Sequence, residues 1–167
     1  NAQFWLDQGA SHLIVTSYVF SNGSFSQERL EKLVAITGKE RLILDLSCRI
    51  RDGRYWIVTD RWTKFTDMEL TPDTLKQLAS YCDEFLIHAV DVEGKCDGVD
   101  LDLVKLMAEH SPIISTYAGG AKSLKDLEDI TRISNNRVHL TIGSALDIFG
   151  GSQIAYKDAL AFNRSYK

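Results

Sequence analysis

The feature that most constrains this chain is a repeated alternation of short apolar runs with longer amphipathic segments. Five runs rich in β-branched residues are predicted strands: Leu13–Ser17, Leu42–Leu46, Phe85–Ala89, Ile113–Tyr117 and Val138–Ile142. They lack clean polar/apolar alternation, as expected of parallel strands buried on both faces. Strand starts lie about 25 to 29 residues apart, except for one longer gap between Leu42 and Phe85. This is the spacing of βα units, with an insertion after the second strand.

Helix-start signals precede the segments between the strands. Hydroxyl and carboxylate side chains accept hydrogen bonds from the free N–H groups of a first helical turn, and proline fits its first position. The predicted starts are Ser24 with Gln27 at capping-box spacing, Thr71 before Pro72, Asp100 and Ser123, and a final helix is predicted over Tyr156–Arg164.

One domain, or a piece of one, is expected, because no linker or composition shift divides the chain. Five βα repeats fit either an open doubly wound sheet or part of a (β/α)8 barrel. A complete barrel typically takes about 250 residues, whereas this chain has 167. Strand count alone slightly favours the open sheet, but the residues at the strand ends favour the barrel.

The overall composition excludes some partners. A net charge of −4 argues against binding nucleic acid or an anionic membrane, both of which reward a basic face. No apolar run reaches the roughly 18 residues of a membrane span. Phosphate can still bind locally, because backbone N–H groups and helix N-termini attract it. Cys48, Cys82 and Cys96 show no CxxC spacing, which favours reduced intracellular thiols over disulfides.

Glycines follow the last two predicted strands. Gly119 and Gly120 end one strand, and Gly143 and Ser144 end the next, just before a short helical turn. Glycine lets the backbone approach a ligand closely, and loops after the last two strands of such barrels commonly cradle phosphate. The alternative is that these glycines only permit tight turns. Two such ends on consecutive strands favour the phosphate cradle.

Three other side chains are candidates for chemistry. Asp45 ends a strand that is otherwise apolar, and partial burial suits a carboxyl group to general acid–base catalysis, although Ser47 or Arg49 could instead hold it as a structural cap. His88 is either a substrate-facing residue or a satisfied core histidine. Trp62 lies in the long insertion, which could cover a heterocyclic substrate or simply pack on its own aromatic residues.

The strand-end strings closely resemble those of the eukaryotic ProFAR isomerases. The resemblance rests on Asp45–Arg49, Phe85–Gly94, Tyr117–Ser123 and Thr141–Gly151, and Val15–Phe20 looks like the fourth strand end of the same family. It implies a (β/α)8 barrel with two phosphate sites. It also implies a cofactor-free and metal-free Amadori rearrangement, in which a bis-phosphorylated ribotide aminoaldose becomes an aminoketose during histidine biosynthesis.

The resemblance also implies roles for individual residues. Asp45 matches the strand-five carboxylate proposed as general acid for ring opening. His88 stands where bacterial members carry threonine, and it is a second catalytic candidate. The implied binding residues are Trp62 on a mobile loop over the substrate, Gly119, Gly120, Gly143 and Ser144 at one phosphate site, and Thr16 and Ser17 at the other.

The resemblance further implies that residues 1–167 are the C-terminal portion of one barrel domain, covering roughly strands four to eight. The strand-one aspartate expected to be the general base is absent, so this polypeptide alone is expected to be inactive. The full-length protein is expected to be a cytoplasmic monomer, or to lie in the plastid stroma in a plant.

Two other functions remain open. One is the cyclase that makes imidazole glycerol phosphate on the same barrel, which an ammonia-dependent assay would identify. The other is a non-catalytic phosphate-binding half-barrel.

Overall fold

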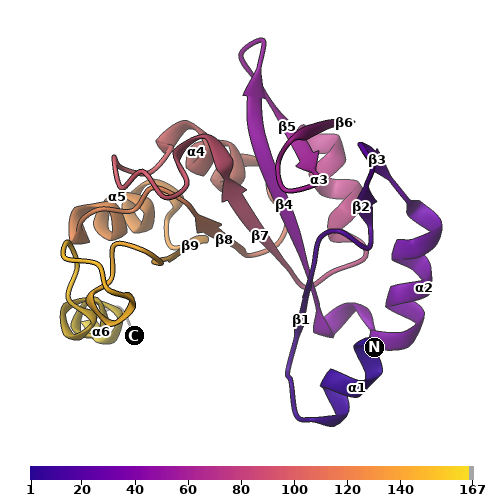
Figure 1. Ribbon diagram of the computed structural model, residues 1–167, viewed down its shortest axis with the longest axis horizontal. Coiled ribbons are helices and arrows are strands. Elements are labelled where there is room, and N and C mark those ends of the chain that lie inside the picture. The colour runs from indigo at the N-terminus through magenta and orange to yellow at the C-terminus, as the bar shows by residue number, and fades with distance from the viewer. Residues whose placement is uncertain (166–167) are drawn as a thin grey trace.

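Five parallel strands form the centre of the fold in the computed structural model, which describes residues 1–165 (Figure 1). In chain order they are β1 (Leu13–Val15), β4 (Leu42–Arg51), β7 (Glu84–Ala89), β8 (Ser115–Ala118) and β9 (Val138–Thr141), and each pairs with the next. All five predicted strands are therefore confirmed. A doubly wound sheet reverses its strand order at a switch point. The sequential order is instead that of consecutive strands of a (β/α)8 barrel.

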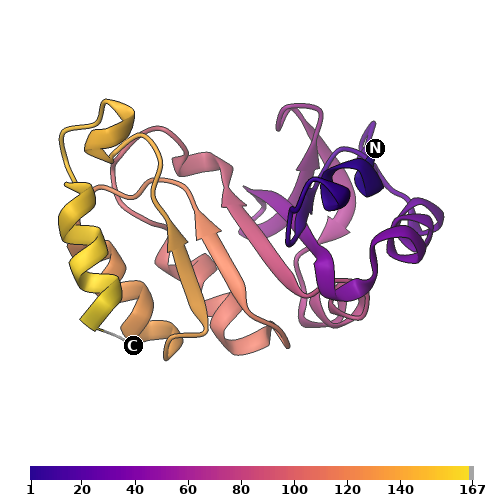
Figure 2. The ribbon, with the colours of Figure 1, turned by 90° about the horizontal axis from the view of Figure 1, so that it is seen from below.

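Helices occupy the connections between these strands, and one further helix lies before β1 and one after β9. They are α1 (Ala2–Asp7), α2 (Gln27–Thr37), α3 (Pro72–Ala79), α4 (Leu101–His110), α5 (Leu124–Ser134) and α6 (Tyr156–Ser165), with single 3-10 turns η1 (Lys39–Arg41), η2 (Val90–Val92) and η3 (Asp147–Phe149). α4 and α5 pack against each other and against β9 (Figure 2).

Three of the predicted helix starts are confirmed. Thr71 accepts from the N–H of Thr74, and Asp100 accepts from the N–H of Leu103. At α5 the Asp126 carboxylate accepts from the N–H of Ser123 at 2.9 Å. The Ser24–Gln27 box is wrong: Ser24 lies in the short strand β3 (Ser24–Phe25), and Ser26 caps α2 instead.

The expectation that the strands are buried on both faces is also wrong. Along β4 the side chains of Leu42, Leu44 and Leu46 are fully buried in the main core, whereas Ile43 and Asp45 between them are half-buried. Successive side chains of a strand point to opposite faces. One face of the sheet therefore holds the core with the helices, and the other carries polar groups.

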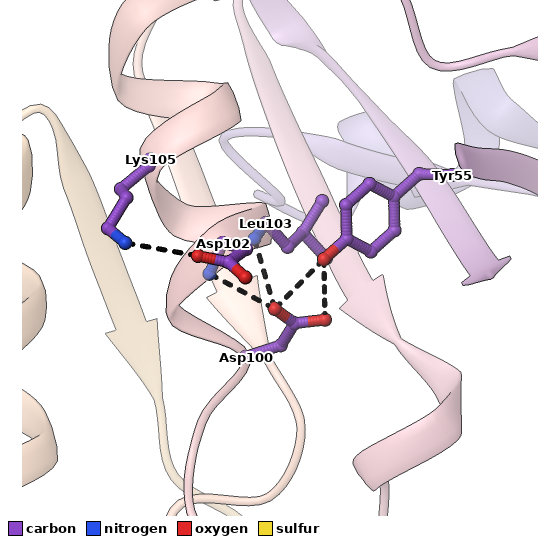
Figure 3. A network of polar contacts seen from close by, with 5 residues as sticks. All are labelled: Tyr55, Asp100, Asp102, Leu103 and Lys105. Atoms are coloured by element: carbon purple, nitrogen blue, oxygen red, sulfur yellow. Dashed lines mark hydrogen bonds and ion pairs between the residues drawn. The ribbon is translucent and has the colours of Figure 1, made fainter. Parts of the chain in front are cut away.

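The insertion between β4 and β7 begins with a three-stranded antiparallel meander rather than a loop, and its β5–β6 part is called the insertion hairpin. The end of β4 pairs antiparallel with β5 (Arg54–Thr59), and β5 pairs with β6 (Lys64–Glu69). Tyr55 on β5 donates to the Asp100 carboxylate at the start of α4 (Figure 3). A second short hairpin, β2 (Phe20–Ser21) with β3, packs beside β6.

Candidate functional site

Asp45 does not end its strand as predicted, because β4 continues to Arg51; it lies just beyond the residues that pair with β1 and is held between two hydroxyl groups. Thr16 Oγ1 donates to Asp45 Oδ2 at 2.9 Å, and Ser47 Oγ donates to Asp45 Oδ1 at 3.0 Å. Of the two alternative cap partners, Ser47 does hold Asp45, whereas Arg49 pairs with Asp91. Each carboxylate oxygen therefore accepts one hydrogen bond from a side-chain hydroxyl. Ser17 is exposed beside Thr16.

Trp62 covers this group from the insertion hairpin. Its indole Nε1–H donates to Ser47 Oγ at 3.2 Å, and its ring lies 5.1 Å from that of His88. The backbone of Asp60, Arg61 and Trp62 has φ values of 53°, 55° and 68°. Three consecutive non-glycine residues in the left-handed region are unusual, because Cβ then crowds the carbonyl oxygen. The turn therefore holds Trp62 against His88 in a strained conformation.

Glu93 belongs to the site although its sequence position did not predict it. Its Oε2 lies 3.1 Å from His88 Nε2, and the His88 side chain is only 22% exposed. The contact is within ion-pair range but lacks hydrogen-bond geometry, so the buried Nε2 has no hydrogen-bond partner. His88 is thus neither a satisfied core histidine nor a fully paired one. The available signal was a carboxylate next to Gly94, shortly after a strand end.

The glycine-bearing strand ends line one small cavity. Gly119, Gly120, Gly143 and Ser144 surround it, together with Glu93. Its volume is about 20 Å³, which is room for roughly one water molecule, so a phosphate would lie at its mouth rather than inside it. All four predicted cradle residues therefore meet at one place, next to the His88–Glu93 pair.

Two of these positions require glycine. A Cβ on Gly119, at a φ of +124°, would lie 2.8 Å from the Ala89 carbonyl oxygen. A Cβ on Gly120 would lie 2.2 Å from the Gly98 carbonyl oxygen, because Gly98 N–H donates to Gly120 O at 2.9 Å. These close approaches bring the β7 and β8 loops together around the cavity.

A second carboxylate, Asp91, links the loop after β7 to the end of β4. Asp91 accepts from Arg49 Nε at 2.8 Å and from the N–H of Ile50 at 2.9 Å. Burial acts to raise the pKa of Asp91, but the Ile50 N–H and the Arg49 guanidinium lower it below its ordinary value. Asp91 thereby joins the root of the insertion hairpin to the loop that carries Glu93. Within residues 1–165, no cluster of histidine, cysteine and acidic residues is arranged to hold a metal ion.

A separate apolar cavity of about 440 Å³ lies along the free edge of β1, lined by residues that include Trp5, Ile14, Tyr18 and Ile36. It contains none of the candidate catalytic residues. We therefore place the chemistry at the strand ends, where the ionisable groups converge.

Comparison with known proteins agrees with the resemblance. Residues 1–151 match a family model described as histidine biosynthesis protein. The chain is 54% identical over 167 residues to a chloroplastic 1-(5-phosphoribosyl)-5-((5-phosphoribosylamino)methylideneamino)imidazole-4-carboxamide isomerase of Medicago truncatula, covering 100% of this chain and 53% of that protein. Isomerases with the same chemical name from Yarrowia lipolytica and Saccharomyces cerevisiae are 46% and 44% identical; each alignment covers 98% of this chain and 65% and 64% of the relative, respectively. The chain spans about half to two thirds of the length of these relatives.

Proposed function

Because the chain belongs to the histidine biosynthesis protein family, we propose that it forms the C-terminal portion of a (β/α)8 barrel isomerase. Its reaction is the Amadori rearrangement of a bis-phosphorylated aminoaldose, ProFAR, to the aminoketose PRFAR. The chemical name shared by the relatives supports this assignment. The five parallel strands in chain order support the barrel.

The observation that carries the proposal is the common location of an acid–base group and a phosphate cradle. Asp45 lies on β4, and the cradle glycines follow β8 and β9 in the same parallel sheet. The carboxyl ends of parallel strands meet at one edge. A substrate phosphate held at Gly119, Gly120, Gly143 and Ser144 would therefore leave the sugar facing Asp45.

We assign the proton transfers as follows. Asp45 takes up a proton and delivers it to the ribose ring oxygen, while Thr16 and Ser47 hold its carboxylate. The base that removes the C2 proton lies on a strand outside these residues, so turnover requires the rest of the barrel. The His88–Glu93 pair is a second proton-transfer group, since His88 Nε2 lies 3.1 Å from Glu93 Oε2 without a hydrogen bond and Glu93 lines the cradle.

The binding roles follow from the same arrangement. The cradle holds one phosphate, and Thr16 and Ser17 contribute to the site for the other. Trp62 stacks over the planar imidazole. Two phosphate anchors orient the substrate, so that its remote binding energy serves the reacting carbon atoms. Acid–base groups and backbone dipoles suffice for this reaction, and no cofactor is required.

The decisive experiment replaces Asp45 with Asn in the full-length protein. We expect isomerisation to fall by roughly 100- to 10,000-fold, the usual contribution of a positioned acid or base. Substrate binding should persist, because the phosphate anchors are untouched. Asp67→Asn, an exposed change on β6, is the matched control. Near-normal turnover in the Asp45 variant would remove Asp45 from the mechanism.

The same proposal covers location and partners. No helix within residues 1–165 is long and apolar enough to cross a membrane. The Medicago truncatula relative is chloroplastic. We propose a monomer that binds no nucleic acid and works in the plastid stroma in a plant and in the cytoplasm elsewhere.

A further inference from the structure

The β2–β3 hairpin touches the strained turn that carries Trp62. The N–H of Gly23 donates to Thr59 Oγ1 at 3.0 Å, and the N–H of Asn22 donates to Asp60 Oδ1 at 3.2 Å. Thr59 is buried at the end of β5, and Asp60 is the first of the three left-handed residues. Two adjacent backbone donors thus hold one side of the turn.

These contacts complete a closed circuit of hydrogen bonds and backbone that passes through Asp45, the candidate acid. The β2–β3 hairpin follows Thr16, whose carbonyl oxygen accepts from the N–H groups of Val19 and Phe20. The Thr16 side chain donates to Asp45, Asp45 accepts from Ser47, and Ser47 accepts from Trp62. The chain then runs from Trp62 back through the turn to Thr59 and Asp60. Thr16 and Trp62 are therefore linked in two ways, through Asp45 and through the hairpin.

The left-handed backbone of residues 60–62 needs contacts from outside the turn to stabilise it. Left-handed backbone is unfavourable for Arg61 and Trp62, so these residues need external contacts to remain in it. On one side Trp62 has the Ser47 hydrogen bond and the His88 ring. On the other side the hairpin holds Thr59 and Asp60, which come directly before Arg61. The Lys64 ammonium also pairs with Asp60 Oδ2 at 2.8 Å.

We propose that the β2–β3 hairpin is a latch that keeps Trp62 against Ser47 and His88, with Thr59 and Asp60 as positioning residues for the reaction. The hairpin follows Thr16 and Ser17 directly in the chain. A phosphate bound at Thr16 and Ser17 therefore reduces the mobility of the hairpin. The latch thus couples occupation of that phosphate site to closure of the tryptophan. Its catalytic consequence and its coupling to phosphate rest on the proposed function, but the contact of the hairpin with the turn does not.

Thr59→Val in the full-length protein tests the latch, because it keeps the β-branched shape and removes the oxygen that accepts from Gly23. Thr66→Val is the matched control. Thr66 is also a buried threonine of the same insertion, but its hydroxyl donates to the Ile57 carbonyl oxygen. Thr59→Ser restores the acceptor. The readout is the 19F resonance of 5-fluorotryptophan at position 62, assigned by its absence in Trp62→Phe.

We expect Thr59→Val to move the Trp62 resonance toward its position in urea, and Thr59→Ser and Thr66→Val to leave it in place. Adding inorganic phosphate should sharpen the resonance in the parent and have little effect in Thr59→Val. In Thr59→Val the value of kcat/KM should fall roughly 10- to 100-fold relative to the parent, the order expected when a positioning contact is lost.

Asp60→Ala provides a second test should Thr59→Val fail to fold. Arg61→Ala is its control, because it also puts alanine at a left-handed position of the same turn but leaves both hairpin contacts in place. Asp60→Ala should move the Trp62 resonance further than Arg61→Ala does.

An unmoved Trp62 resonance in both Thr59→Val and Asp60→Ala overturns the latch. A shifted resonance with unchanged kcat/KM overturns the positioning role. If the resonance shifts as expected but the parent shows no isomerase activity, the latch stands and the proposed function fails.

Discussion

The Trp62 indole and the His88 imidazole lie with ring centroids 5.1 Å apart and their planes inclined at 58°. This tilted contact brings the insertion hairpin onto the strand end where His88 meets Glu93. The two rings come from segments that are distant in sequence, so their contact depends on the whole carboxyl edge of the sheet being assembled.

Replacing Trp62 separates stacking from hydrogen bonding. Trp62→Phe keeps a ring beside His88 but removes the donor to Ser47, whereas Trp62→Ala removes both. We expect Trp62→Ala to raise KM and lower kcat together, by roughly 10- to 100-fold in kcat/KM, because substrate orientation is lost. Trp62→Phe should lose about tenfold or less, close to one hydrogen bond. Steady-state kinetics of the full-length protein measures both, and equal effects would show that stacking contributes nothing.

The cradle predicts that alanine costs much more stability at one of two glycines that share the same φ. Gly120 and Gly53 both have a φ of +72°, but a Cβ at position 53 meets nothing within 4 Å, while at position 120 it would lie 2.2 Å from Gly98 O. Gly53→Ala should cost about 1 kcal/mol of unfolding free energy, from backbone strain alone. Gly120→Ala should cost about 1–3 kcal/mol more, from overpacking.

Chemical denaturation of the two alanine variants provides the measurement. Phosphate affinity should fall in Gly120→Ala and stay unchanged in Gly53→Ala. Equal losses of stability would show that the β7 and β8 loops separate at little cost, which contradicts a built cradle.

The lowered pKa of Asp91 predicts a stability difference that depends on pH. A carboxyl group whose pKa is lower in the folded state stabilises the fold above its ordinary pKa, 3.8, and loses that contribution as the pH falls through the folded value. Asp91→Asn should therefore cost up to about 1 kcal/mol at pH 7, a modest figure because both partners are partly exposed. The difference should shrink below pH 3.8. Denaturation at several pH values checks this, and a constant difference would contradict it.

Burial predicts unequal reactivity of the three thiols. Burial raises the pKa of Cys82 to about 12 and also raises that of Cys48, so both stay protonated and inert in the folded protein. Cys96 is partly exposed, and its Sγ lies 3.6 Å from Ser144 Oγ beside the cradle. Ellman's reagent should modify Cys96 first, and inorganic phosphate should slow that reaction. Rapid modification of Cys82 in the native state, followed by peptide mass mapping, would contradict this burial.

The backbone framework was largely predictable because its determinants are local. Strands such as Leu42–Leu46 are marked by β-branched and apolar runs, and Thr71 and Asp100 cap helices through bonds to the next few residues. Ser24 failed because Asn22 and Gly23 next to it form a hairpin turn, which placed the start of the helix at Ser26. Turn chemistry overrode the capping pattern there.

Individual residues of the site could be predicted from the sequence, but the contacts between them could not. Asp45 and the cradle glycines were identified because each follows a short apolar run, although β4 continues past Asp45 to Arg51. Glu93 was missed because its importance depends on His88 lying 3.1 Å away, a relation that spacing along the chain does not encode. The latch was missed for the same reason, since Gly23 and Thr59 are 36 residues apart.

The two-sided character of β4 separates its tasks by parity. Even-numbered side chains such as Leu44 hold the sheet to the helices, and odd-numbered ones such as Asp45 and Ser47 face the chemistry. Substitutions at the odd-numbered positions can thus change reactivity without reducing stability, and substitutions at the even-numbered positions can raise thermal stability without altering the reaction. Substitutions at alternate positions of β4 should therefore change either the stability or the reactivity of the protein, with little effect on the other.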